Sequence, residues 1–105
     1  MRKRMKRMLK FKVEGQTIQK DGDFSGLVRG SVGYLSAKFT FSDEWKGCKI
    51  AASFWADGKE HAVMLRQGMC EIPPEVLMHS RFYVQCTGMK QGFLIKTNKT
   101  LVRQD

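Results

Sequence analysis

Apolar and polar residues alternate with a period of two along most of the chain. In the first example, Leu9, Phe11 and Val13 are separated by Lys10 and Lys12. A period of two is typical of a β-strand that buries one face and exposes the other. The sequence therefore predicts a strand that begins at Leu9 and keeps its lysines in water.

The clearest alternation covers residues 34–41. One face of this predicted strand carries Leu35, Ala37, Phe39 and Phe41, and the other carries Tyr34, Ser36, Lys38 and Thr40. Two further alternating runs, residues 50–56 and 61–65, flank the dipeptide formed by Asp57 and Gly58. An Asp-Gly pair favours the two-residue turn of a β-hairpin, because both turn positions need a positive φ. We expect these two runs to pair as a hairpin.

Two prolines interrupt the strand pattern after Ile72. Proline has no backbone N–H, so it ends a strand, but it is tolerated in the first turn of a helix. We therefore expect residues 73–77 to form one helical turn with Val76 and Leu77 packed inward. Beyond a further turn at residues 89–91 the sheet closes. The inward residues predicted after the helical turn are Phe82, Val84, Cys86, Phe93, Ile95 and Leu101.

The segment that follows the longest strand carries a serine and a tryptophan. Ser42 can cap a short turn, because its hydroxyl can accept hydrogen bonds from the backbone N–H groups that follow it. Asp43 and Glu44 suit the positive end of that turn. Trp45 then lies where it can fold over the edge of the sheets, and we expect a structural lid on the core. A platform for a ligand is the alternative.

Together these elements predict an all-β fold, a small Ig-like antiparallel β-sandwich with one short helical turn. The length of 105 residues suits a single domain, which we expect to cover residues 9–105. The composition, 42% apolar and 28% charged, is that of a globular protein. No apolar run reaches the roughly 18 residues of a transmembrane helix, so no membrane partner is expected.

The net charge of +9 is concentrated at the N-terminus. Five basic residues come before residue 8 with no acid among them: Arg2, Lys3, Arg4, Lys6 and Arg7. Residues 8–105 hold the other 14 of the 19 basic side chains and all 10 acidic ones, which leaves +4. We expect residues 1–8 to form a basic arm without fixed structure. Such an arm can contact nucleic acid or an acidic protein. It can also be a solvated tail in front of a start at Met8, and a membrane surface is the weakest option.

Residue types that usually carry catalysis are few and dispersed. His61 and His79 are the only histidines, and neither belongs to an HExxH or HxxxH motif. Cys48, Cys70 and Cys86 are odd in number and form no CxxC pair, so reduced thiols are expected. The sequence contains no glycine-rich phosphate loop. We predict a chain that is not an enzyme and needs no metal or cofactor.

Outward-facing residues of the predicted strands are the candidates for function. Tyr34, Trp55, Met64, Tyr83 and Gln85 would form an exposed aromatic and methionine group on one sheet. Such a group is typical of a surface that binds a partner. The alternative is that a second layer, such as an irregular N-terminal segment, covers it. An unpaired sheet edge could also join two copies into a homo-oligomer.

Several motifs, taken in order, resemble those of a known group of proteins. FTFSDEWKG is followed by KIAASFW, then by CEIPPEVL, FYVQCTG and KTN. This order resembles that of small β-sandwich modules of bacteriophage particles, such as the N-terminal domains of head-fibre and baseplate proteins. The resemblance covers residues 9–102. It implies a non-enzymatic phage or prophage protein, a virion structural or assembly module that binds another particle protein in the virion or in the cytoplasm of the bacterial host.

Two other functions fit the same residues. One is a small phage-encoded inhibitor of a host defence nuclease, of the anti-CRISPR type, which, being positively charged, would clamp the enzyme or compete through its guide RNA. The other is an OB-like module that binds nucleic acid. In that module the arm would contact phosphates while Tyr34, Trp55 or Tyr83 stacks on bases.

Overall fold

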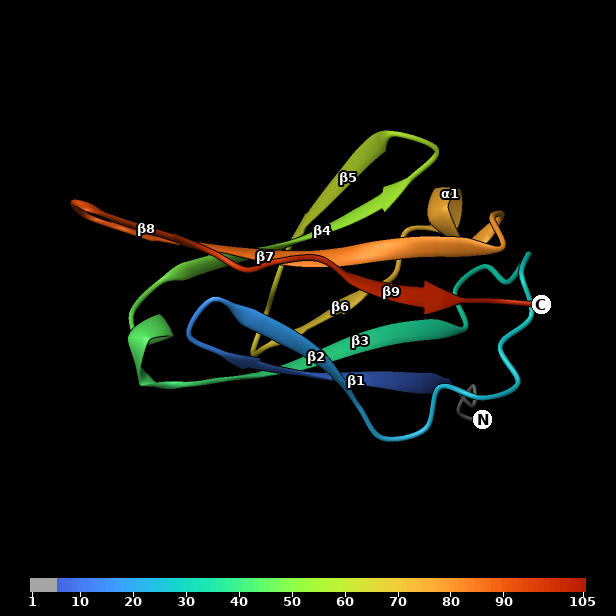
Figure 1. The fold of residues 1–105 in the computed structure, drawn as a ribbon, viewed down its shortest axis with the longest axis horizontal. Coiled ribbons are helices and arrows are strands. Elements are labelled where there is room, and N and C mark those ends of the chain that lie inside the picture. The colour runs from blue at the N-terminus through green and yellow to red at the C-terminus, as the bar shows by residue number, and fades with distance from the viewer. Residues whose placement is uncertain (1–5) are drawn as a thin grey trace, which may run out of the picture.

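The computed structural model describes residues 6–105 and consists of two β-sheets packed face to face (Figure 1). The strands are β1 (Arg7–Glu14), β2 (Thr17–Asp21), β3 (Leu35–Phe41), β4 (Lys49–Ala56), β5 (Lys59–Met64), β6 (Met69–Glu71), β7 (Arg81–Lys90), β8 (Phe93–Lys96) and β9 (Thr100–Arg103). A 3-10 turn, η1 (Asp43–Trp45), and one helical turn, α1 (Pro74–Leu77), complete the elements. The all-β sandwich and the helical turn at the two prolines are confirmed.

The two sheets differ in how their strands are connected. The four-stranded sheet has the order β2-β1-β3-β6, and the five-stranded sheet has the order β5-β4-β7-β8, with β9 also paired to β7. Among the described strands, β1 and β3 run parallel, with Arg7 opposite Leu35, and the other pairs are antiparallel. This pair departs from the antiparallel arrangement that the sequence predicts. The reason is that β2 has already brought the chain back to the end where β1 begins, and residues 22–34 cross that end to place β3 on the other side of β1.

Arg7 belongs to the folded domain, although the sequence analysis placed it in the basic arm. The first strand begins at Arg7, two residues before the predicted start. The Arg7 guanidinium donates hydrogen bonds to the backbone carbonyls of Asp23 (3.2 Å) and Ser25 (2.8 Å). Lys6, just before the strand, forms an exposed ion pair with Glu71 at 2.8 Å. The strand extends further than the alternation of large apolar residues alone indicated.

The core lies between the sheets and is built from the inward rows that the sequence predicts. Phe11 of β1 stacks on Phe39 of β3, with ring centroids 5.1 Å apart, and Phe54 of β4 lies 6.4 Å from Phe82 of β7. The α1 turn buries Val76 and Leu77 completely, as expected. The largest fully buried side chains are Trp45, Phe11, Phe54, Phe82, Leu9, Ile72 and Leu77.

Trp45 closes the end of the sandwich where the chain passes from β3 to β4. Its side chain is 2% exposed, and the indole N–H donates to the Gly15 carbonyl at 2.9 Å. The ring lies directly against Gly88 of β7, where an added Cβ would come within 2.7 Å of two ring carbons. The structural lid predicted for Trp45 is confirmed.

Ser42 contributes to the same end but does not cap the 3-10 turn. It makes no side-chain capping bond, and its hydroxyl instead accepts a hydrogen bond from the Gly15 N–H at 2.9 Å. A hydrogen bond from Ser42 also lowers the pKa of the Glu44 carboxyl. The serine therefore ties the β1–β2 turn to the segment that carries Trp45.

A break between β8 and β9 changes which residues face the core. Both strands pair with β7, but residues 97–99 lie between them, outside the regular ladder. Here the Thr97 hydroxyl accepts from the Cys86 N–H at 2.9 Å and takes the place of a backbone carbonyl. The break shifts the alternation by one residue. Val102 is therefore fully buried, and the predicted core position of Leu101 is wrong.

The same break joins the two sheets. Asn98 turns away from β7 toward the β1–β2 hairpin, where its side-chain carbonyl accepts from the Ile18 N–H at 2.9 Å. The Asn98 backbone N–H donates to the Gln16 carbonyl at 3.0 Å. These bonds supply partners for backbone groups of the hairpin that are not paired with a neighbouring strand. The Asn98 side chain is thus part of the frame that holds the two sheets together.

We predict that Gly88→Ala destabilises the fold by about 1–3 kcal/mol, because the new methyl group would overlap the packed Trp45 ring. Urea unfolding should show a lower midpoint with an unchanged slope. The control is the same substitution in a Trp45→Leu background, where the six-membered ring that contacts position 88 is absent. The additional loss should then be much smaller. An equal loss in both backgrounds would contradict the assigned contact.

Candidate interaction surface

The outward face of the five-stranded sheet carries four of the five residues that the sequence marks as a partner-binding group. Residues directly opposite each other on paired strands point to the same side of a sheet. Trp55 of β4 lies opposite Tyr83 of β7. Gln85 and Met64 lie two and four positions further along the same face. The sequence pattern correctly assigned all four to one side.

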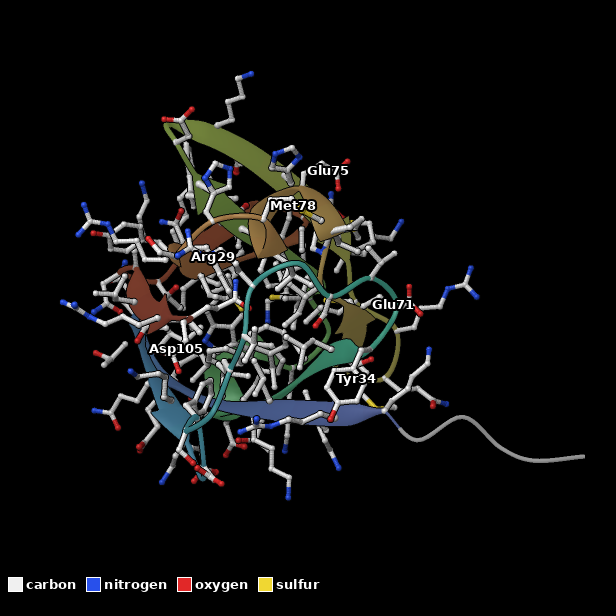
Figure 2. The ribbon with its side chains drawn as sticks, turned by 90° about the vertical axis from the view of Figure 1, so that its right-hand side faces the viewer. Arg29, Tyr34, Glu71, Glu75, Met78 and Asp105 are labelled. Atoms are coloured by element: carbon white, nitrogen blue, oxygen red, sulfur yellow. The ribbon has the colours of Figure 1, made fainter. Side chains whose placement is uncertain are left out.

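Tyr34 is not part of this face. It precedes β3, which belongs to the four-stranded sheet, and its carbonyl accepts a hydrogen bond from the Arg7 N–H at 2.9 Å. Figure 2 shows the exposed Tyr34 ring beside β1, at the end of the molecule that faces the viewer. The predicted single group is corrected here, because alternation within a strand does not reveal which strands share a sheet.

Two of the four residues are partly covered. The Lys99 ammonium lies 3.8 Å from the centroid of the half-buried Trp55 ring. The Gln85 side-chain amide donates to the Thr97 carbonyl at 2.8 Å. The cover comes from the break at residues 97–99, not from an N-terminal segment. Tyr83 and Met64 stay exposed, so the covering layer extends over only part of the face.

Two apolar residues of this face that are as exposed as Met64 were not predicted from the sequence. Met89 and Leu94 lie opposite each other on β7 and β8, and their side chains are 59% and 58% exposed. The predicted turn at residues 89–91 is wrong, because β7 continues to Lys90 and the turn is only Gln91 and Gly92. The Gln-Gly pair between two alternating runs was the available signal.

The β7–β8 hairpin extends beyond the rest of the sandwich (Figure 1). For this reason Phe93, which was predicted to close the core, is 38% exposed. A shallow hollow of about 670 Å³ lies along the hairpin and includes Gly47, which precedes β4, and Lys49 of β4. We call the exposed outward residues Met64, Met89 and Leu94 the apolar strip.

A second hollow, of about 550 Å³, lies at the other end of the same sheet. Its lining includes Arg29, Trp55, Asp57, Arg81, Tyr83 and Lys99. Among residues 6–105, none of the three cations of this hollow has a carboxylate oxygen within 4.0 Å. The Trp55 indole N–H is buried and finds no acceptor within that part of the chain. An unsatisfied buried donor costs about 1–3 kcal/mol, which makes this end of the face unusual.

The basic arm is only partly covered by the structure. Arg2, Lys3 and Arg4 lie outside the described residues, so their role in an arm stays a prediction. Lys6 and Arg7 both make contacts with the folded domain. The charge available to a flexible arm is therefore smaller than the five residues that the sequence suggested.

Groups that could support metal or thiol chemistry are not brought together in the described part of the chain. No set of three His, Cys, Asp or Glu side chains there could hold a metal ion. Likewise, no helix within residues 6–105 is long and apolar enough to cross a membrane. Burial raises the pKa of the Cys70 thiol to about 12 and raises that of Cys86 further above its usual value. Both thiols are therefore protonated, and unreactive as nucleophiles, at neutral pH.

Comparisons of the chain with protein-family models, with curated proteins and with solved structures find no match.

We predict that the stability of the fold decreases as the pH rises above about 9. Burial favours the neutral thiol, so the folded-state pKa of Cys70 and Cys86 exceeds the ordinary value of 9.0. The unfolded chain therefore loses these protons first, and the stabilisation present below that pH is lost between about pH 9 and pH 12. Urea unfolding under reducing conditions, at about pH 8 and about pH 10.5, measures the decrease.

The reference for this measurement is the double variant Cys70→Ala, Cys86→Ala. It keeps the tyrosines and lysines that also titrate in this range. Its stability should decrease less over the same pH interval than that of the unaltered chain. Parallel pH profiles for the two proteins would show that the thiols do not contribute.

Proposed function

We propose that this chain is a non-enzymatic binding module whose partner is a protein. The observation that carries the proposal is the apolar strip on the projecting β7–β8 hairpin (Figure 1). Single exposed apolar residues are ordinary, but Met89 and Leu94 lie opposite each other on one face of the hairpin, and Met64 lies on the same side of the sheet. Phe93 adds an exposed ring on the other face of the hairpin. Exposed apolar groups of this kind are typical of protein-binding surfaces.

The geometry of the hairpin suits an anchor. The ladder between β7 and β8 holds Met89 and Leu94 in fixed positions, so little conformational freedom is lost when a partner covers them. The hairpin also projects past the core, so it can enter a hollow on the partner. Buried apolar anchors at the centre of an interface usually carry most of its binding energy.

Lysines indicate the charge of the partner. Lys49 lies opposite Met89, and Lys96 is exposed on the same face as Leu94. The Lys90 ammonium lies 4.8 Å from the centroid of the Phe93 ring. No carboxylate lines the hollow along the hairpin. We infer a partner surface with an apolar centre and an acidic rim, since complementary charges steer association and disfavour wrong partners.

The resemblance of the sequence motifs supports another phage particle protein as this partner, in the virion or in the cytoplasm of the bacterial host. The motifs correspond to the frame of the sandwich: FTFSDEWKG ends in the Trp45 lid and CEIPPEVL contains the α1 turn. An inhibitor of a host defence nuclease could use the same strip. The identity of the captured protein separates these two functions.

We predict that Met89→Glu together with Leu94→Glu abolishes capture of the partner, because the substitutions remove the apolar anchors and place negative charge against an acidic rim. The tagged chain is used to capture proteins from a lysate of phage-producing host cells, with and without nuclease treatment, and the captured proteins are identified by mass spectrometry. The unaltered chain should recover phage particle proteins both with and without nuclease treatment, and the variant should not.

Tyr34→Glu is the matched control, because Tyr34 is comparably exposed but lies just before β3, beside the other sheet. This variant should capture the same proteins as the unaltered chain, and both variants should keep the circular dichroism spectrum. If the hairpin variant captures particle proteins as well as the control does, the apolar strip is not the interface. Recovery of a host nuclease in place of particle proteins would favour the inhibitor.

A further inference from the structure

The hollow at the far end of the outward face has the size of a small-ligand site. Its volume is about 550 Å³, within the usual range for pockets that hold small molecules. Four segments meet around it: the β4–β5 turn, the connection from α1 to β7, the break before β9 and the 22–34 connection. Figure 2 looks onto this end of the molecule, where Arg29 and Met78 lie side by side.

Unpaired positive charge is the first property of this hollow. Arg29, Arg81 and Lys99 come from three different segments, and no carboxylate oxygen of residues 6–105 lies within 4.0 Å of their charged groups. Asp57 is the one acidic residue of the lining. Two guanidinium groups and one ammonium in a concave site attract an anion, and guanidinium groups match the geometry of a phosphate.

Adjacent aromatic rings are the second property. Trp55 and Tyr83 are directly opposite each other on β4 and β7, and Tyr83 is 39% exposed. Flat rings at the surface of a sheet beside cationic side chains are the arrangement with which proteins bind single-stranded nucleic acid. Base stacking needs only an accessible ring face, so it requires no base-specific hydrogen bonds.

Lys99 connects these two properties. Its ammonium lies over the Trp55 ring at 3.8 Å from the centroid. A contact of this kind at an exposed site changes an equilibrium by only about two- to fivefold. A phosphate that binds the ammonium would therefore readily draw Lys99 away from the ring, and the ring face would become accessible to a base. The same ligand would then use both the charge and the aromatic surface.

We propose that this hollow is a binding site for a nucleotide unit, in which Arg29, Arg81 and Lys99 bind the phosphate and Trp55 and Tyr83 stack on the base. An acidic peptide would use the three cations but not the two rings. A base with its phosphate uses all five groups. The nucleotide unit can belong to a free nucleotide or to a single strand of nucleic acid, and both present the same chemistry.

The test is a fluorescence titration of the full chain with the oligonucleotide (dT)15 and, separately, with the mononucleotide dTMP. Binding should weaken as salt is added. Trp55→Leu, which leaves the charge unchanged, should weaken binding of (dT)15 by about 5- to 150-fold. The conservative variant Trp55→Phe should retain part of the affinity. Arg29→Ala and Arg81→Ala should each reduce the salt slope by about one.

Lys38→Ala is the matched control for charge, because Lys38 is exposed on β3 of the other sheet. It should change binding much less than either arginine variant. The hairpin variant Met89→Glu, Leu94→Glu should bind (dT)15 through the hollow with an affinity lowered only by its added charge. The proposal of a nucleotide site and the proposal of a protein-binding strip can therefore be refuted independently.

If the chain binds both (dT)15 and dTMP, one nucleotide suffices for binding. If it binds (dT)15 but not dTMP, the single strand is the ligand. Either result supports the site if Trp55→Leu weakens it. Undetectable binding of both probes would overturn the proposal. The proposal would also be overturned if Trp55→Leu left the affinity for (dT)15 unchanged, or if poly-glutamate displaced (dT)15 as effectively as unlabelled (dT)15 does. Each of these results would indicate an electrostatic contact without stacking.

Discussion

The packing of Trp45 between the two sheets is the contact on which the rest of this sandwich depends. Trp45 lies at the end where the chain crosses from one sheet to the other, and its indole N–H reaches the Gly15 carbonyl. The ring occupies the space that any side chain at Gly88 would need. The close approach of the two sheets at this end therefore depends on one aromatic ring and one glycine.

Much of the fold was predictable because a local rule governs each element. Alternation identified the inward rows, the Asp57-Gly58 pair identified a hairpin, and two prolines identified the helical turn. The predictions failed where residues distant in the sequence determine the strand pairing or the face that a side chain occupies. The parallel pairing of β1 with β3 depends on where a long connection ends. The shift from Leu101 to Val102 depends on Asn98, which bonds to a strand 80 residues away in the sequence.

The interaction surface was predictable to a smaller extent, for a related reason. A period of two correctly placed Trp55, Tyr83, Gln85 and Met64 on one side, since that depends only on the strand. It could not separate Tyr34 from them, because membership of a sheet is a property of the whole topology. It also could not show that the β7–β8 hairpin extends past the core, which is why Met89 was assigned to a turn and Phe93 to the interior, and why Leu94 was not among the candidates.

The two ends of the outward face differ in chemistry because the core supports only one of them from below. At the hollow, Trp55 and Tyr83 lie over buried neighbours, Phe54 and Phe82, so the rings are held in place and cations can gather around them. At the hairpin, six residues further along β4 and hence about 20 Å away, the strands have left the core. Apolar side chains there are exposed on both sides of a two-stranded ribbon. A second macromolecule can cover such a ribbon, whereas a small ligand cannot, and this difference is why we propose protein binding at one end and nucleotide binding at the other.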